Sequence, residues 1–278
     1  MHSLVRVLIG VNVPNFGPGT DPGVLREWAR TVEGLGFDLL MMSDHVVVTP
    51  DVAEQYPAPF YEPFTTLSWL AGVTERITLG TTVLIAPYRH PLLVARMAAN
   101  LSDLSGGRLV LGVGVGWARQ EFEALGVPFN RRGKLTDELI TVAREAWQDA
   151  GYRAGHIPIW VGGSSDGALR RAARLGDAWH PLRQTPAQWE ESLARLVSLA
   201  DGQLPSLAPR ILLKLTGPVS HGRHLGEGTL EQVIGDLDRL RADGAHAVVL
   251  DPFIGDPEET RHPEPAWDAL AAVRKEFR

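Results

Sequence analysis

The stretch LLMMSDHVV, residues 39–47, places an acid and an imidazole side by side directly after a run of apolar residues. Such a run predicts a buried strand, so Asp44 and His45 would stand at the end of a strand rather than inside it. A histidine titrates near neutral pH and can give or take a proton during a reaction. The alternative is a structural histidine in a loop, and the residues alone are compatible with both roles.

The glycine-rich stretch GVGVGW, residues 112–117, is a second candidate for chemistry. It is not the dinucleotide pattern GxGxxG, because Trp117 occupies the sixth position and no acidic residue follows at the expected distance. We interpret it as a strand whose small residues let a flat ligand or a neighbouring backbone come close. Packing alone is the alternative.

A third candidate, WVGGSSD at residues 160–166, leads from a predicted strand straight into a predicted helix. Flexible glycines before free helical N–H groups form an anion pocket, so Gly162, Gly163 and Ser164 predict a phosphate site. An acidic N-cap at Asp166 would instead satisfy the same donors.

Metal-dependent and serine-dependent hydrolysis are disfavoured by the spacing of the polar residues. The chain has no HxH pair after its first predicted strand and no HExxH motif. His221 and His224 lie in a glycine-rich loop without a carboxylate between them, and no GxSxG motif is present. We therefore predict no metal site.

Composition narrows the class of protein further. A net charge of −6 argues against binding to nucleic acid by the protein as a whole. The absence of cysteine excludes disulfides and thiolate chemistry and fits a reducing compartment. No apolar run approaches the roughly 20 residues that span a bilayer, and the amino terminus does not have the pattern of a signal peptide. We expect a cytoplasmic protein that binds neither nucleic acid nor membrane.

Short apolar runs alternate with segments of helical period along the chain. Strands are predicted at residues 5–13, 38–42, 77–84, 109–115, 158–161, 178–180, 211–216 and 247–250, and helices at 22–35, 64–74, 92–104, 134–150, 166–175, 186–199, 229–242 and 264–277. The strands are continuous apolar runs, which is typical of parallel strands buried on both faces.

Eight strand–helix units without a break in composition predict an α/β fold, a (β/α)8 TIM barrel that forms one domain over residues 1–278. A doubly wound open sheet is the alternative. Barrel active sites lie at the C-terminal ends of the strands. Three long loops, residues 49–61, 117–133 and 217–228, would overhang that face, and the last of them would serve as a lid.

Four segments together resemble the luciferase-like monooxygenase superfamily and, among its branches, most closely the actinobacterial oxidoreductases that use the deazaflavin coenzyme F-420. They are LGFDLLMMSDHVV, ITLGTTVLIAPYRHPLLVARMAANLSDLSGGRLVLGVGVGW, EFEALGVPFNRRG and IPIWVGGSSDGALRRAARLGDAW. The resemblance is dense over residues 1–180. It implies a barrel of the bacterial-luciferase type with a flavin-like ring bound at its mouth.

The resemblance also implies roles for individual residues. In related proteins the acid–histidine pair after the second strand contacts the ring and takes part in proton transfer, which makes His45 the expected catalytic residue. The third strand of such proteins ends in a bulge with a non-proline cis peptide, which maps onto Thr82 and Val83 and would back the ring. The cofactor-binding residues implied in this way are Asp44, Thr82, Val83, Val115, Gly116, Gln120 near the ribityl chain, and Gly162, Gly163 and Ser164 at the phosphate.

One departure from the family pattern bears on the substrate. Members that oxidise sugar phosphates carry a glutamate where Trp117 stands, so its absence argues against that substrate class. Trp117, Phe60 and Tyr61 instead predict a substrate-binding wall for an uncharged, partly apolar small molecule.

The implied reaction is hydride transfer between coenzyme F-420 (8-hydroxy-5-deazaflavin) and that substrate. An FMN-dependent monooxygenase that uses reduced flavin and oxygen is the close alternative, and a non-catalytic flavin-binding protein is a further one. A reductase or dehydrogenase would recycle the cofactor. Related barrels are often homodimers packed through early helices, and Trp28 and Trp69 would serve either such a contact or the core.

Overall fold

The protein is described by a computed structural model over residues 6–200 and 202–277. Ten short strands form its main sheet, and every pairing between them is parallel. They are β1 (Leu8–Asn12), β2 (Leu39–Met42), β3 (Thr78–Thr81), β4 (Leu84–Ile85), β5 (Leu109–Gly114), β6 (Ile159–Gly162), β7 (Ala178–His180), β8 (Ser206–Leu207), β9 (Arg210–Leu212) and β12 (Ala247–Asp251). Two further strands, β10 (Lys214–Leu215) and β11 (Glu227–Gly228), pair with each other.

The sheet curls until its two ends meet. Its strand order is β8-β7-β6-β5-β3-β2-β1-β12-β9, with β4 paired to β5. Leu182, just after β7, forms a parallel bridge with Arg210 of β9, and the Ala208 amide donates to the Trp179 carbonyl at 2.9 Å. These contacts close the circle, so the predicted TIM-barrel fold is confirmed.

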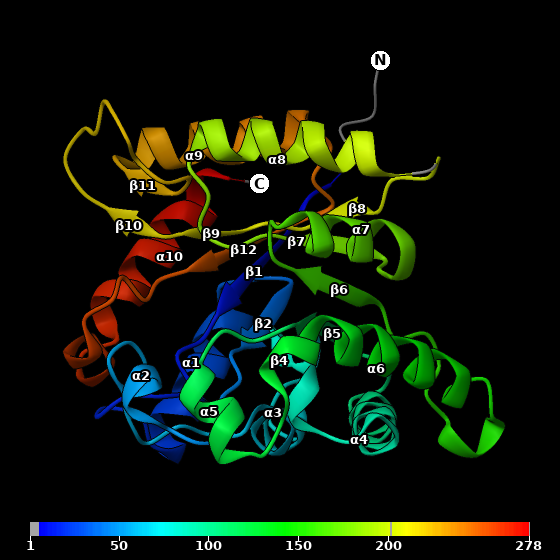
Figure 1. Cartoon of the computed structure of the whole chain (residues 1–278). Coiled ribbons are helices and arrows are strands. Elements are labelled where there is room, and N and C mark those ends of the chain that lie inside the picture. Colours follow the sequence, from blue (N-terminus) through cyan, green and yellow to red (C-terminus); the bar gives the residue numbers. More distant parts are fainter. Residues whose placement is uncertain (1–5, 201, 278) are drawn as a thin grey trace.

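Helices cover the outside of the barrel (Figure 1). They are α1 (Pro22–Gly34), α2 (Pro50–Ala53), α3 (Pro63–Ala71), α4 (Pro91–Leu104), α5 (Arg119–Ala124), α6 (Arg132–Ala146), α7 (Asp166–Leu175), α8 (Pro186–Leu199), α9 (Leu230–Ala242) and α10 (Glu264–Glu276). The local sequence determines where several of these helices begin. Asp21 caps the start of α1, and capping boxes at Thr185 and Thr229 start α8 and α9. Four 3-10 turns, η1 (Ala86–Tyr88), η2 (Phe129–Arg131), η3 (Ala150–Tyr152) and η4 (Pro257–Arg261), complete the elements.

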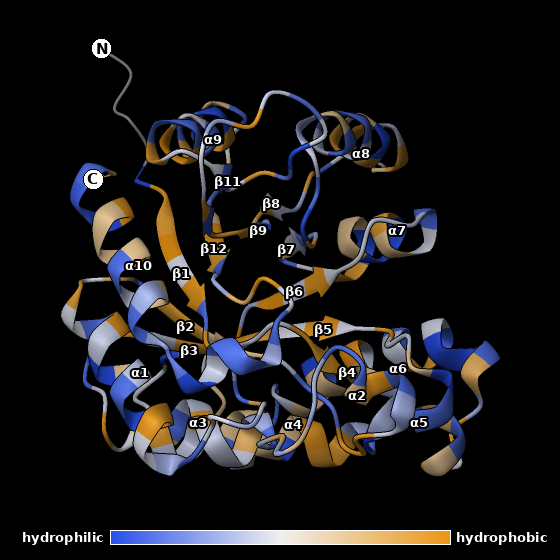
Figure 2. Cartoon of the chain, turned by 90° about the vertical axis from the view of Figure 1, so that its left-hand side faces the viewer, coloured by the Kyte–Doolittle hydropathy of each residue, from blue (hydrophilic) through white to orange (hydrophobic). Residues whose placement is uncertain are grey.

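Strand residues pack alternately into two cores. In β2, Leu39 and Met41 belong to a small cluster inside the barrel, whereas Leu40 and Met42 belong to the large cluster between the strands and the helices. Figure 2 shows the resulting pattern of hydrophobic strands surrounded by helices with hydrophilic faces. Burial on both faces explains why the strands are continuous apolar runs.

The structure differs from the sequence prediction mainly near the strand ends. The third predicted strand is split into β3 and β4 by a non-proline cis peptide between Thr82 and Val83. The seventh, residues 211–216, is divided into β9 and β10. Residue 5, the predicted start of the first strand, lies outside the described residues. The loops at 49–61 and 117–133 contain the short helices α2 and α5, which span too few residues to show an apolar period.

Among the described residues, no helix combines the length and the apolar character needed to cross a membrane.

Candidate functional site

A cavity of about 260 Å³ opens where the carboxyl ends of the barrel strands meet. Its walls are formed by residues after β2, between β3 and β4, at the ends of β5, β6 and β7, and in β9. The lining residues are Ser43, Asp44, His45, Tyr56, Thr82, Val83, Ile85, Gly114, Val115, Gly116, Trp117, Gly162, Gly163, His180, Leu182 and Arg210. Most of the residues singled out in the sequence therefore come together in one place.

His45 is held by a carboxylate that the sequence did not point to. Its Nδ1 lies 2.6 Å from Oε2 of Glu121, and both side chains are almost completely buried. The same carboxylate accepts hydrogen bonds from the amides of Val46 (2.6 Å) and Val47 (3.0 Å) and from the Tyr88 hydroxyl (3.0 Å). Glu121 thus closes the turn after β2 onto α5 and fixes the imidazole at the cavity wall.

The partners of Glu121 determine its charge and the tautomer of His45. Burial raises the pKa of Glu121, but the hydrogen bonds from His45 and from the Val46 and Val47 amides outweigh burial and leave the pKa lowered. An ionised carboxylate can only accept, so Nδ1 of His45 carries the proton. No hydrogen bond to its Nε2 occurs within the described part of the chain, and this nitrogen is free to act on a bound molecule.

The carboxylate of Asp44, next to His45 in the chain, anchors the segment after the bulge by hydrogen bonds. Its Oδ1 accepts from Arg89 Nη2 at 2.8 Å, and its Oδ2 accepts from Arg89 Nη1 at 2.7 Å and from the Ile85 amide at 2.8 Å. Arg89 also reaches Glu62 at 3.0 Å. Because both carboxylate oxygens of Asp44 are engaged, we expect it to orient the segment after the bulge rather than to exchange protons.

The bulge between β3 and β4 packs against glycines at the carboxyl ends of β5 and β6, and we call this surface the cradle. A Cβ atom on Gly114 would lie 2.4 Å from Val83 Cγ2, and one on Gly162 would lie 3.0 Å from Val83 Cγ1. Gly116 has a φ of +75°, and its Cβ would lie 2.7 Å from Ile85 Cγ2. These glycines make room for the side chains of Val83 and Ile85, so the bulge packs closely against the strand ends. Val83 and the glycines line the cavity, where a planar ring would lie against them.

The turn before α7 lies between the cradle and a second cavity with polar walls. Its N-cap is Ser165, which accepts from the Ala168 amide at 3.3 Å, so the alternative of an N-cap at Asp166 is wrong. Ser164 lies in an adjoining cavity of about 350 Å³ with Gln184. Gln184 Nε2 donates to Ser164 Oγ at 3.1 Å, while its buried Oε1 has no partner among the described residues.

A buried hydrogen-bond chain runs along one wall of the cavity. Nδ1 of His180 bonds to the Ala208 carbonyl, and its Nε2 accepts from the Thr82 hydroxyl at 2.8 Å. Arg210 Nη1 donates to the Thr82 carbonyl at 2.6 Å and to the Thr82 hydroxyl at 3.3 Å. Burial lowers the pKa of His180 to about 4, and the charge of Arg210 acts in the same direction. His180 is therefore neutral in the folded protein.

The neutral state of His180 predicts a loss of stability in mild acid. The unfolded chain takes up a proton near the ordinary histidine value of 6.5, whereas the folded protein does so only near 4. Stability is therefore fully present above about pH 6.5 and falls as the pH drops towards 4, by about 2 kcal/mol from His180 alone between pH 7 and pH 5. Urea unfolding at the two pH values measures this fall in the free energy of unfolding.

A His180→Asn variant should lose this part of the pH dependence. A His156→Asn variant, which changes an exposed histidine, should keep it. Equal pH dependence in all three proteins would show that His180 is not the titrating group.

Aromatic rings surround His45 on the open side of the cavity. The ring of Tyr56 stacks at 5.6 Å, and those of Phe60 and Trp117 meet His45 edge to face at 5.4 and 5.7 Å. Trp117 is 44% exposed and lines the cavity as predicted. Neither Phe60 nor Tyr61 lines it. Phe60 lies behind the ring of His45, and the Tyr61 carbonyl accepts from Asn15 Nδ2 at 2.6 Å.

Other expected residues lie outside the cavity. Gln120 is exposed on α5, where its backbone N–H donates to Asp51 Oδ2 at 3.2 Å. Trp28 is buried and packs edge to face against Trp267, so it belongs to the core, whereas Trp69 is 36% exposed. The sequence did not single out Glu121, Arg89, Tyr56 or Arg210 as parts of the site, and His180 stood out only as one of several polar residues near strand ends. The signal for Glu121 was its place at the start of EFEALGVPFNRRG, one of the segments that carry the family resemblance.

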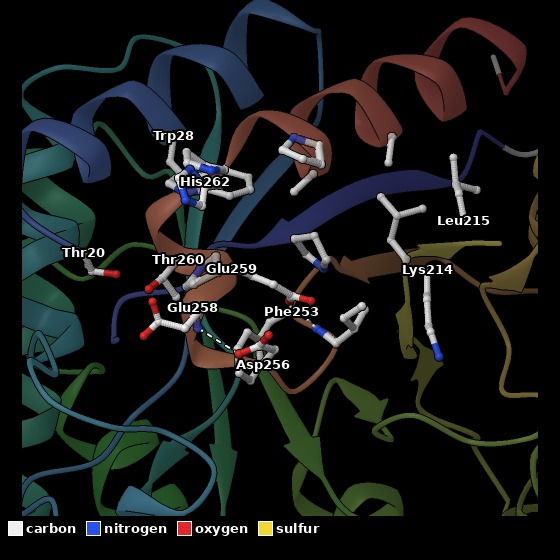
Figure 3. Close-up of a pocket in the computed structure, with 18 residues that line it drawn as sticks. Thr20, Trp28, Lys214, Leu215, Phe253, Asp256, Glu258, Glu259, Thr260 and His262 are labelled. Atoms are coloured by element: carbon white, nitrogen blue, oxygen red, sulfur yellow. Dashed lines mark hydrogen bonds between the residues drawn. The ribbon is translucent and has the colours of Figure 1, made fainter. Parts of the chain in front are cut away.

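A larger cavity of about 410 Å³ lies beside η4 and α10 (Figure 3). Phe253 in its wall lies 6.1 Å from Tyr56, so aromatic side chains separate the two cavities. None of the predicted site residues lines the larger cavity, and no cluster of metal-ligating side chains occurs in the described ranges. The held imidazole and the glycine cradle place the candidate site in the smaller cavity.

Comparison with known proteins finds a family match that includes most residues of the candidate site. Residues 5–216 match the model of the luciferase-like monooxygenase family. An F-420-dependent glucose-6-phosphate dehydrogenase of Microbacterium testaceum is 31% identical over 65% of this chain and 58% of that enzyme, so the chain spans less than two thirds of that relative.

Two solved structures share the fold. The F-420-dependent tetrahydromethanopterin reductase of Methanopyrus kandleri superposes with a TM-score of 0.74 at 16% identity, over 98% of this chain and 100% of that one. The oxygenating constituent of 3,6-diketocamphane monooxygenase from Pseudomonas putida, solved in complex with FMN, gives a TM-score of 0.70 at 15% identity, over 97% of both chains. Barrels of this type thus occur in proteins named for either cofactor.

Proposed function

The chain belongs to the luciferase-like monooxygenase family, and we propose that it is an oxidoreductase that uses coenzyme F-420 to transfer a hydride to or from a small, partly apolar organic substrate. The observation that carries the proposal is the unpartnered Nε2 of His45, whose Nδ1 is held by Glu121 next to the glycine cradle. F-420 is favoured over FMN because a relative named for F-420 is 31% identical, whereas the solved FMN complex is 15% identical and shares the fold alone.

The residues present fit such a cofactor. The cradle formed by Val83, Gly114 and Gly116 would hold the ring, and Gly163 and Ser164 would hold the phosphate beside the adjoining cavity, which Arg183 and Arg195 also line. The deazaflavin supplies the hydride chemistry when it is bound. The protein positions the ring and excludes water from it.

His45 would handle the proton that accompanies the hydride. Its Nδ1–H is fixed on Glu121, so Nε2 can take a proton from an alcohol or, once protonated, give one to a carbonyl. Trp117 and Tyr56 would cover the substrate with apolar surface. These rings argue for an uncharged substrate and against the sugar phosphate in the name of the relative from Microbacterium.

The first experiment is a pair of fluorescence titrations of the purified apo-protein, one with coenzyme F-420 and one with FMN. Tight binding of F-420 with FMN excluded supports the proposal, and a screen of alcohols, enones and imines would follow. Selective binding of FMN would overturn it in favour of an oxygen-dependent monooxygenase with a reductase partner. A bound cofactor that no donor reduces would favour a non-catalytic flavin-binding protein.

Filling the cradle should weaken the binding of the ring. In a Gly114→Ala variant the new methyl group meets Val83, whose branched side chain sits on the bulge and has little freedom to move. Overpacking of this kind costs about 1–3 kcal/mol. If the methyl group displaces Val83 towards the ring, a similar cost falls on binding, which corresponds to about a fivefold to 150-fold rise in Kd for F-420. The fluorescence titration measures it.

A matched control is Gly235→Ala in α9, where an added Cβ meets nothing within 4 Å. It should leave the affinity unchanged and, as an alanine in a helix, raise stability slightly. Equal affinity of the Gly114→Ala variant and the wild type would show that the ring does not lie on Val83.

A further inference from the structure

Asp251, at the end of β12, holds two arginines in the interior of the protein. The carboxylate is fully buried, and its Oδ2 accepts from Arg183 (Nη2, 2.7 Å) and from Arg210 (Nη2, 2.8 Å). Asn12 donates to the other oxygen at 3.0 Å. Burial raises the pKa of Asp251, but the positive charges of Arg210 and Arg183 prevail and lower the pKa, so Asp251 is ionised.

The charges in this cluster do not cancel. Two guanidinium groups face one carboxylate, so the cluster carries one net positive charge. His180, which bonds to Thr82 on the same wall, is neutral. The carboxylates of Asp44 and Glu121 also line or adjoin the cavity, but they are engaged by Arg89 and His45.

Arg210 is the member of this cluster that lines the cavity, so it brings the positive charge to the cavity wall. Its side chain is 6% exposed and lines the cavity, whereas Arg183 points to the Phe253 carbonyl and is 25% exposed. Arg210 Nη1 bonds to the carbonyl of Thr82, directly before Val83 in the bulge that forms the cradle. A buried charge in such a low-dielectric site acts strongly on any charge that appears next to it.

We propose that Arg210 is the electrostatic partner of the cofactor ring and stabilises the negative charge that the ring gains on reduction. The proposal rests on the proposed function. A hydride taken from the substrate brings two electrons and one proton to the ring, so the ring becomes more negative by one charge while the substrate is oxidised and releases a proton to His45. A fixed cation beside the ring then favours the reduced over the oxidised cofactor.

The size of the effect follows from this preference. Without Arg210 the reduced cofactor should lose about tenfold to a hundredfold in affinity relative to the oxidised one. Each tenfold change corresponds to about 30 mV for a two-electron couple, so the midpoint potential of the bound cofactor should fall by about 30–60 mV.

The experiment compares the midpoint potentials of the holoproteins by equilibration with reference dyes, after cofactor loading is verified by fluorescence. Arg210→Met should lower the potential, and Arg210→Lys, which keeps the charge, should stay close to the wild type. Asp251→Asn should shift the potential upward, because it removes the compensating negative charge. Arg108→Met is the matched control, since Arg108 precedes β5 at the opposite end of the barrel and bonds to the Ile77 carbonyl there.

The outcomes separate this inference from the proposed function. Loaded Arg210→Met protein with an unchanged potential, or a downward shift in Asp251→Asn, would overturn the role of Arg210 while the cofactor assignment stands. If the wild type binds FMN instead of F-420, the proposed function falls, and the same shifts measured on FMN still decide the role of Arg210. If the wild type binds neither cofactor, both proposals fall. Should Arg210→Met not fold, Arg210→Lys and Asp251→Asn decide the matter.

Discussion

A His45→Asn variant is expected to lose turnover by about a hundredfold to ten-thousandfold, the range that a well-placed proton donor or acceptor contributes. Asparagine can still donate a hydrogen bond to Glu121 in place of Nδ1, so the turn after β2 keeps its anchor. It has no group that takes up a proton near neutral pH. The measurement is the rate at which loaded enzyme oxidises or reduces the substrate found in the screen.

The same variant should bind the cofactor with nearly unchanged affinity. The cradle residues Val83, Gly114 and Gly116 lie in the bulge before β4 and at the end of β5, and they do not depend on the imidazole. A His156→Asn variant, changed at an exposed histidine far along the chain, is the control for both measurements. Steady-state rates equal to those of the wild type would remove His45 from the chemistry and leave it a structural residue.

Local pattern was sufficient to predict most of the fold. The strand at residues 178–180 and the helices at 166–175 and 186–199 agree with the structure at both ends. Apolar runs of strand length and helix-period segments each carry their own signal within a few residues. The local apolar run before Asp44 and His45 also predicted that this pair lies at a strand end. The family resemblance predicted the cis peptide between Thr82 and Val83.

The partners that give the site residues their properties could not be predicted in this way. Glu121 lies 76 positions from His45, and His180 lies 98 positions from Thr82. No pattern within one element marks such pairs, because only the closed barrel makes the strand ends neighbours. A buried polar group needs a partner, but the sequence does not say which one.

Glu121→Gln should reveal what the carboxylate does, because glutamine has nearly the same shape but a different pattern of donors. In the wild type, Oε1 of Glu121 accepts from the Val46 and Val47 amides, and Oε2 faces His45 and Tyr88. Glutamine can meet the two amides only with its oxygen, so its NH₂ group must point at Nδ1 of His45. That nitrogen then has to accept, and the ring proton moves to Nε2.

This reversed tautomer predicts a loss of turnover of about a hundredfold or more, with the cofactor still bound. The direct readout is the ¹⁵N spectrum of labelled histidine, which should report Nδ1–H in the wild type and Nε2–H in the variant. Glu123→Gln, an exposed change on the same helix α5, is the matched control and should alter neither. If the Glu121→Gln variant reverses the tautomer and keeps full turnover, Nε2 of His45 is not the proton acceptor; if the tautomer stays as in the wild type, Glu121 does not determine it.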